Sequence, residues 1–208
     1  MQSPRWSPDG KQLALLVSSK DAVQIYAISS DGGAPRPIHS DPSVVTSGNS
    51  SLNWSRDGIW IYFVSRRSGT VESWKAPVRG GTAVQVTRNG GLTAVESPDG
   101  KFVYYLKGTP PLSLWRVPAG GGEESTVLAR VPSPLGFAEG GLYFSARDAP
   151  SGPATLRFFS FATATVKPIA EIGRQRMTGL TVSPDQRTLV YAEAELGGMD
   201  LMLVDGFR

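Results

Sequence analysis

A four-residue turn recurs along this chain at near-regular intervals, and this recurrence constrains the fold more than any other feature. Ser-Pro-Asp-Gly stands at residues 7–10 and 97–100, with the variants Ser-Arg-Asp-Gly at 55–58 and Ser-Pro-Asp-Gln at 183–186. The turn aspartates lie 48, 42 and 86 residues apart, and the last interval is twice 43. A diverged fifth copy fits in that interval at 136–148, where Gly140 takes the place of Gly100. Five copies with this period indicate four-stranded propeller blades.

The turn itself has a simple conformational explanation. Proline at its second position favours a type I turn, and glycine at its fourth position accepts a left-handed backbone. The aspartate side chain accepts backbone N–H bonds and closes the turn on itself. We therefore interpret seven residues as structural turn residues, with a catalytic or metal-binding role as the alternative: Asp9, Gly10, Asp57, Gly58, Asp99, Gly100 and Asp185. The last copy departs from the pattern at Gln186, where the turn glycine is replaced.

Each copy contains the same succession of short segments rich in β-branched and aromatic residues. Second strands are expected at 12–18, 60–66, 102–107, 141–147 and 188–194, and third strands at 23–29, 71–77, 112–118, 155–161 and 200–206. Helical periodicity is absent from the sequence, and such short strands bury their faces when four-stranded sheets stack. The sequence thus predicts an all-β propeller of four-stranded antiparallel blades.

The repeat boundaries predict one domain over residues 1–208. The blades are expected at about 1–40, 41–88, 89–130, 131–171 and 172–208, and the last of them lacks a fourth strand. We interpret these five blades as part of a larger propeller. The alternative is an open or strained five-bladed ring, whose edge strands would be prone to associate.

Composition narrows the classes of function. The chain has no cysteine, so disulfides and thiolate chemistry are excluded. Its net charge of +3 comes from scattered basic residues, whereas nucleic-acid binding usually needs a clustered basic stripe. The apolar runs are strand-sized, and no segment resembles a membrane span or a signal peptide. We therefore expect no nucleic-acid binding and no membrane insertion by this segment, while its compartment stays open.

Known catalytic and metal-binding patterns are not found in the sequence. The single histidine, His39, lies beside Asp41, but no Gly-x-Ser-x-Gly elbow supplies a nucleophile. Gly120–Gly122 are not followed by the Lys-Ser/Thr pair of a phosphate loop, and no residues show metal-ligand spacing. We predict no catalytic, cofactor-binding or metal-binding residues and hence no enzyme activity or cofactor.

Irregular loops are the expected place for recognition, because loops on a rigid scaffold commonly carry binding residues. In a four-stranded meander these loops fall on the face opposite the repeated tight turns. Arginine is favoured at interface hot spots because its planar guanidinium presents several hydrogen-bond donors in a fixed arrangement. We therefore predict a protein or peptide partner at Arg66, Arg67, Arg174 and Arg176. The alternative is that these arginines are solvated loop charges.

Three stretches of the sequence resemble the TolB-like β-propeller repeats: WSPDGKQLALLV at 6–17, VESWKAPVRGGTAVQVTRNGG at 71–91 and ESPDGKFVYYLKG at 96–108. The resemblance covers essentially the whole chain and is weakest in the fourth copy. Within that family, the sequence is similar to the C-terminal propellers of bacterial membrane-bound winged-helix transcriptional regulators or Ser/Thr kinases. That similarity implies a sensor or interaction domain of a larger regulatory protein on the extracytoplasmic side.

The resemblance leaves two other functions open. TolB-like propellers also gate the hydrolase domain of some serine peptidases, which would make this chain the substrate-gating part of a peptidase. The third possibility is a propeller that binds a small ligand or sugar in its central channel.

Overall fold

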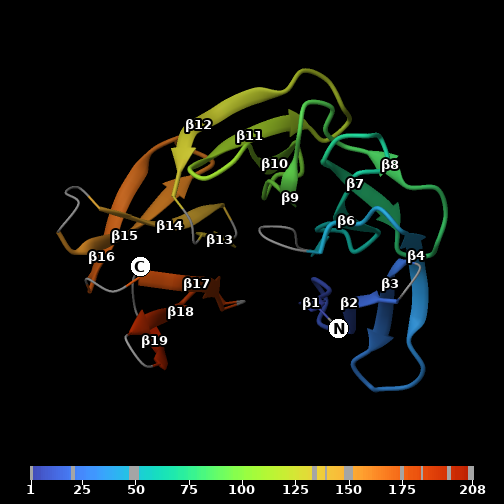
Figure 1. Ribbon diagram of the computed structural model, residues 1–208, viewed down its shortest axis with the longest axis horizontal. Helices are drawn as coiled ribbons and strands as arrows, with labels where there is room; N and C mark the ends of the chain where they lie inside the picture. The colour runs from blue at the N-terminus through green and yellow to red at the C-terminus, as the bar shows by residue number, and fades with distance from the viewer. Residues whose placement is uncertain are drawn as a thin grey trace. The chain divides into compact units, whose positions relative to one another are not determined.

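The computed structural model consists of β-strands, turns and loops (Figure 1). It describes residues 2–19, 22–46, 52–132, 135–138, 140–147, 152–173, 176–183, 185–195 and 198–205. The strands form five antiparallel sheets, each a meander of consecutive strands, and this confirms the predicted all-β fold. Four of these sheets have four strands each, and the last has three strands in the described part of the chain.

The strand bounds follow the sequence repeat closely. The first sheet contains β1 (Gln2–Trp6), β2 (Gln12–Ser18), β3 (Val23–Ser29) and β4 (Arg36–Asp41). The second contains β5 (Asn53–Trp54), β6 (Trp60–Ser65), β7 (Glu72–Pro77) and β8 (Val84–Gln85). The third contains β9 (Leu92–Glu96), β10 (Phe102–Lys107), β11 (Leu112–Pro118) and β12 (Ser125–Val131).

The remaining two sheets complete the series. The fourth contains β13 (Leu135–Ala138), β14 (Gly141–Arg147), β15 (Ala154–Ser160) and β16 (Val166–Ile172). The fifth contains β17 (Arg176–Val182), β18 (Thr188–Glu195) and β19 (Gly198–Asp205). Each predicted second or third strand overlaps an observed strand with bounds that differ by at most two residues, because alternating apolar residues and turn glycines fix these segments locally.

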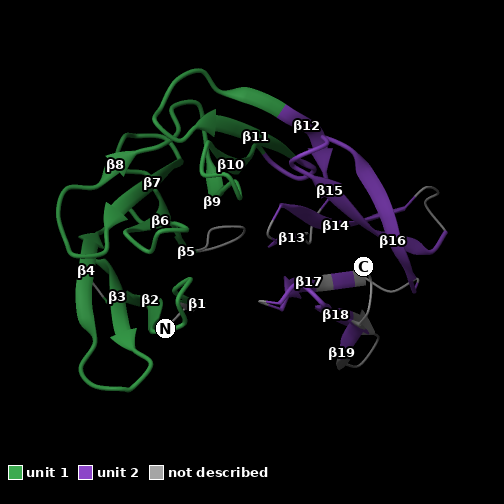
Figure 2. Ribbon diagram, turned by 180° about the vertical axis from the view of Figure 1, so that it is seen from behind, with its two compact units in different colours: residues 1–108, 113–126 green, residues 109–112, 127–208 purple. Residues whose placement is uncertain are grey.

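The chain forms two compact units, which Figure 2 shows in different colours. Unit 1 comprises residues 1–108 and 113–126, and unit 2 comprises residues 109–112 and 127–208. The division falls within the third sheet, so that β12 contributes residues to both units.

Two apolar clusters of described residues pack the sheets of unit 1 against each other. The first packs β2, β3 and β4 against β6 and β7, with Leu16, Ile25 and Phe63 nearly fully buried. The second surrounds Tyr62 and Tyr105 and joins the second sheet to the third. These layers bury faces that single strands of five to seven residues leave exposed, and burial of that area is the main favourable term in folding.

Hydrogen bonds between sheets add specificity to this packing in unit 1. Arg36 Nη1 donates to the carbonyl oxygen of Val78 at 2.6 Å, which ties the first sheet to the second. Between the second and third sheets, the Tyr62 hydroxyl donates to Glu96 Oε1 at 2.7 Å. Burial, assisted by the Glu96 carboxylate, raises the pKa of Tyr62. The Tyr62 hydroxyl therefore stays a donor at physiological pH.

Unit 2 has its own core between β14, β15, β17 and β18. Leu156 and Leu189 are fully buried there, and the Tyr143 ring packs on the Phe158 ring at a tilt of 40°, with centroids 4.6 Å apart. On the outer strand β19, by contrast, Leu201 and Leu203 are 77% and 65% exposed. The last sheet therefore presents an apolar face to solvent within the described structure.

Candidate functional site

The predicted turn residues form one hydrogen-bond pattern that is repeated four times. The serine hydroxyl donates to the aspartate in each copy: Ser7 to Asp9 at 2.6 Å, Ser55 to Asp57 at 2.5 Å, Ser97 to Asp99 at 2.6 Å and Ser183 to Asp185 at 2.5 Å. The same hydroxyl accepts the N–H of the first residue of the next strand, for example Phe102 at 3.0 Å. Each aspartate also accepts a backbone N–H two residues on, as in Lys101 to Asp99 at 3.1 Å. One oxygen of each aspartate, Oδ1, is thus engaged within its own turn.

The fourth position of each turn adopts the left-handed conformation whatever residue occupies it. Gly10, Gly58 and Gly100 have φ of 69°, 70° and 67°, and Gln186 has φ of 61°. A side chain at such a φ costs roughly 1–2 kcal/mol because Cβ crowds the following carbonyl.

Replacing Gln186 by glycine is therefore expected to raise the free energy of unfolding by about 1 kcal/mol, since relief of this strain exceeds the extra entropy of the unfolded chain. Urea unfolding followed by far-UV circular dichroism measures the change. The matched variant is Gly100→Ala, which puts a Cβ at φ 67° and should change stability in the opposite direction. If both substitutions changed the free energy of unfolding equally and in the same direction, backbone strain at the fourth turn position would not be the cause.

Acid should weaken these turns. The Ser97 hydroxyl, followed by the Lys101 N–H, holds the pKa of Asp99 below its ordinary value of 3.8, and the Ser7 and Ser183 hydroxyls do the same for the pKa values of Asp9 and Asp185. A carboxylate with a lowered folded-state pKa stabilises the protein fully above the unfolded pKa, and this contribution is lost as the pH falls through the folded pKa.

We therefore expect the free energy of unfolding to fall as the pH drops below about 4. The Asp99→Asn variant should show a shallower acid dependence than the wild type, and so should Ser97→Ala, which removes the same bond from the other partner. Urea unfolding at a series of pH values measures these slopes. Unchanged slopes in both variants would show that the bond does not lower the folded-state pKa.

Arg66 and Arg67, two of the predicted partner-binding residues, begin the turn between β6 and β7. The segment after β4 clamps this turn, because the Arg66 N–H donates to Ser43 O and the Val45 N–H donates to Val64 O, each at 2.9 Å. Asp41 is buried and accepts the Ser65 hydroxyl at 2.8 Å. The backbone that carries both arginines is therefore held on a rigid support.

The two arginine side chains have different surroundings. Arg67 Nε lies 3.7 Å from Asp41 Oδ2, and the Arg67 guanidinium lies 5.1 Å from the centre of the Trp74 ring. Arg67 Nη1 also lies 3.3 Å from His39 Nε2. The Arg66 side chain is exposed. Arg67 thus joins two sheets of unit 1, whereas Arg66 is presented to solvent.

His39 belongs to this same junction. Burial and the nearby Arg67 lower the pKa of His39, so its ring is neutral at physiological pH. The ring packs on Phe63 with centroids 5.1 Å apart. These contacts give His39 a packing role between β4 and β6.

The other two predicted partner-binding residues are not described in the same detail. Arg174 lies outside the described residues, and Arg176 is the first residue of β17, with no description of its side chain. Their role stays a prediction.

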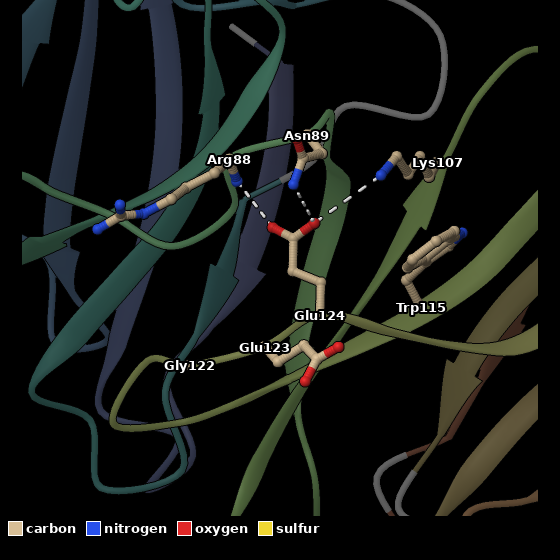
Figure 3. A pocket seen from close by; sticks show the side chains of 7 residues that line it. All are labelled: Arg88, Asn89, Lys107, Trp115, Gly122, Glu123 and Glu124. Carbon is tan, nitrogen blue, oxygen red and sulfur yellow. Dashed lines mark hydrogen bonds and ion pairs between the residues drawn. The ribbon is translucent and has the colours of Figure 1, made fainter.

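A pocket of about 440 Å³ in unit 1 was not predicted from the sequence. Its lining side chains come from the segment after β8, the end of β10, the middle of β11 and the turn before β12: Arg88, Asn89, Lys107, Trp115, Gly122, Glu123 and Glu124. Figure 3 shows Glu124 at the centre of this group, with its carboxylate directed toward Asn89 and the backbone of Arg88.

Hydrogen bonds from neighbouring residues hold the Glu124 side chain in place within the pocket. This side chain is only 9% exposed, and Oε1 accepts the Arg88 N–H at 2.7 Å. Oε2 accepts Asn89 Nδ2 at 3.3 Å and lies 3.8 Å from Lys107 Nζ. The buried Tyr105 hydroxyl is close by, and burial together with Glu124 raises the pKa of Tyr105. Glu124 therefore joins the third sheet to the segment that leaves the second.

Two residues that line the pocket differ from the residues at the same positions of the preceding copy of the repeat. When Pro118 is aligned with Pro77, Glu124 falls on the position of Ala83 in the preceding copy. When Gly100 is aligned with Gly58, Lys107 falls on the position of Ser65. The fourth and fifth copies also carry a charged residue at the position of Lys107, namely Arg147 and Glu193, so the sequence evidence for the pocket was Glu124 in place of Ala83.

The described residues form neither a metal-binding cluster nor a helix that could span a membrane. No three histidine, aspartate or glutamate side chains come together there in a way that would hold a metal ion. In the same residues, no helix has the length and apolar character needed to cross a membrane.

Comparison with known proteins establishes the family. The model of the TolB β-propeller domain matches residues 1–119, more than half of the chain. The chain therefore belongs to the TolB β-propeller family, as its repeats indicated.

Relatives of this chain are longer than the chain itself. The uncharacterized protein Atu1656 of Agrobacterium fabrum is 31% identical over 104 residues, which are 49% of this chain and 34% of that protein. The crystal structure of TolB from Acinetobacter baumannii matches 98% of this chain and 51% of its own, with a TM-score of 0.73 and 19% identity. An acylaminoacyl peptidase structure matches 99% of this chain and 37% of its own, with a TM-score of 0.69 and 15% identity. The chain thus spans between a third and a half of these proteins.

Proposed function

We propose that this chain is a non-catalytic protein-binding part of a β-propeller, in which the turn that carries Arg66 and Arg67 contacts a protein or peptide partner. The observation that carries the proposal is the support of this turn by Ser43, Val45 and Asp41, together with the exposure of Arg66. A rigid support reduces the entropy lost on binding, so an exposed arginine there contributes more of its interaction energy to affinity.

The proposal also covers the extent of the domain and its place in a larger protein. Residues 1–208 form one propeller domain, and it is a sensor or interaction domain of a larger regulatory protein. The match to only about half of the TolB structure supports a larger protein.

Site-specific photocrosslinking tests the partner-binding surface. A photoreactive amino acid at Arg66 should crosslink one protein in cells, whereas the same amino acid at Lys101 should not. Lys101 is likewise exposed and follows a repeated tight turn. The Arg66→Glu variant should weaken binding of the identified protein. Arg67→Glu is a poorer test, because it also breaks the contact with Asp41. The same crosslink at both positions, or none at either, would refute the proposal.

A second candidate function is the substrate-gating propeller of a serine peptidase. The observation that favours it is the match of 99% of this chain to part of an acylaminoacyl peptidase. Sequencing the reading frame on both sides of the segment distinguishes the candidates. A continuous hydrolase domain would support gating, whereas a winged-helix or kinase domain would support the regulator.

A further inference from the structure

The pocket around Glu124 contains hydrogen-bond donors that the protein does not use. Lys107 Nζ lies 3.8 Å from Glu124 Oε2, which is too long for a hydrogen bond, and 4.1 Å from the centre of the Trp115 ring. Among the described residues, no acceptor lies within hydrogen-bonding distance of this ammonium. The Lys107 side chain is 22% exposed and lines the pocket.

The charges of the pocket are balanced. Arg88 and Lys107 are positive, and Glu123 and Glu124 are negative. Glu124 is fixed by bonds from the Arg88 backbone and Asn89, while the side chains of Arg88 and Glu123 lie exposed at the rim. Figure 3 shows the Arg88 guanidinium and the Glu123 carboxylate directed away from each other. A strongly anionic or cationic ligand would meet repulsion from one pair of these groups.

Trp115 supplies the apolar part of the wall. Its indole Nε1 donates to Ser113 Oγ at 2.9 Å, so the N–H is already satisfied, and the part of the ring that Lys107 does not cover lines the pocket. Pockets for small ligands combine such an aromatic surface with a few placed polar groups, in volumes of roughly 300–1,000 Å³. The volume of about 440 Å³ falls within this range.

We propose that this pocket binds a neutral saccharide. A sugar hydroxyl both donates and accepts, which matches a lining that alternates ammonium and amide donors with carboxylate acceptors. One hydroxyl oxygen accepts from Lys107 Nζ, a second hydroxyl donates to Glu123, and an apolar ring face lies beside Lys107 against the part of the Trp115 ring that Lys107 leaves uncovered. This site lies in unit 1 between the second and third sheets, and it is separate from the turn at Arg66 and Arg67.

Titration with defined sugars tests the proposal. The probes are glucose, galactose and N-acetylglucosamine, with a tetrasaccharide of N-acetylglucosamine to distinguish the end of a glycan chain from a free sugar. The readout is the indole N–H resonance of Trp115 in a ¹⁵N–¹H spectrum, assigned by its loss in Trp115→Phe. Acetate, methylammonium and glycine are the anionic, cationic and zwitterionic comparison ligands. At least one neutral sugar should shift this resonance in a saturable way, and the three charged ligands should not.

A matched pair of variants locates the binding site. Lys107→Met keeps the aliphatic chain over Trp115 and removes the donors, so it should weaken sugar binding about tenfold, the loss typical of one charged hydrogen bond. Lys75→Met is the control, because Lys75 Nζ lies 4.9 Å from the centre of the Trp60 ring in a similar contact outside the pocket. This variant should bind the sugar as the wild type does.

Three results would overturn the proposal. The first is that no neutral sugar shifts the Trp115 resonance. The second is that acetate, methylammonium or glycine shifts it more than the sugars do, which would identify a charged ligand. The third is that Lys107→Met and Lys75→Met weaken sugar binding equally. Photocrosslinking at Arg66 should be unaffected by Lys107→Met, so this test and the test of the partner-binding surface are independent.

Discussion

Replacing Gly141 by alanine should lower the free energy of unfolding of unit 2 by about 3 kcal/mol, at the upper end of overpacking effects. Gly141 is the buried first residue of β14 and pairs with Ser160. A Cβ at this position would overlap the Phe158 ring and the carbonyl oxygen of Phe159. The ring can move only by disturbing its stack on Tyr143, and the carbonyl is part of the neighbouring strand.

Gly179→Ala is the matched control, because Gly179 lies in the strand β17 of the same unit and a Cβ there meets nothing within 4 Å. Its effect should stay within about 0.5 kcal/mol. Far-UV circular dichroism in urea is the suitable measurement, since all five tryptophans lie in the part of the chain assigned to unit 1. Equal stability of the two variants would mean that β14 and β15 can separate without cost.

The strands were predictable because their determinants are local. The segment 12–18 was expected as a second strand, and β2 has these bounds, because alternating apolar residues and the turn at Gly10 specify it without reference to the rest of the chain. The fourth copy was harder, since it lacks the Ser-Pro-Asp sequence. There β13 and β14 are joined by two residues only, as Ala138 pairs with Gly141, whereas six residues separate the paired Trp6 and Leu13 in the first copy.

The pocket was not predictable in the same way, because its parts come from different strands. Glu124, Lys107 and the Arg88 backbone meet only after the second and third sheets pack on each other. Arg67 illustrates the same limit. The sequence placed it correctly in an exposed loop, but its contact with Asp41 depends on the end of β4, 26 residues earlier in the chain. Such long-range side-chain contacts can be predicted only when the pairing of the strands and the packing of the sheets are known.

Glu72 is the residue whose loss should destabilise unit 1 most among single carboxylates. Its side chain is fully buried at the start of β7. The carboxylate accepts the Thr87 hydroxyl at 2.6 Å, the Thr70 hydroxyl at 2.9 Å and the Gly90 N–H at 3.0 Å. The Thr87 oxygen in turn accepts the Ser73 N–H at 3.0 Å. Glu72 thus holds the segment that leads from the second sheet to the third.

Glu72→Ala is expected to lower the free energy of unfolding by about 3 kcal/mol, because it leaves a cavity and deprives the buried Thr87 hydroxyl and the Gly90 N–H of their acceptor. Glu72→Gln should cost about half as much, since the amide keeps the volume and one acceptor oxygen but turns an N–H₂ toward other donors. The exposed Glu123→Ala is the control, with an effect within about 0.5 kcal/mol. Urea unfolding followed by tryptophan fluorescence reports on unit 1.

The same substitution should reach the pocket, because Arg88 and Asn89 lie between the two groups that Glu72 binds, Thr87 and Gly90. Loosening this segment weakens the bonds to Glu124, so the Trp115 indole resonance should shift in Glu72→Ala even without a ligand, and the shift should be smaller in Glu72→Gln. If Glu72→Ala lowered stability but left this resonance unchanged, Glu72 would support the sheet alone. If both variants were as stable as Glu123→Ala, the buried network would carry no net stabilisation.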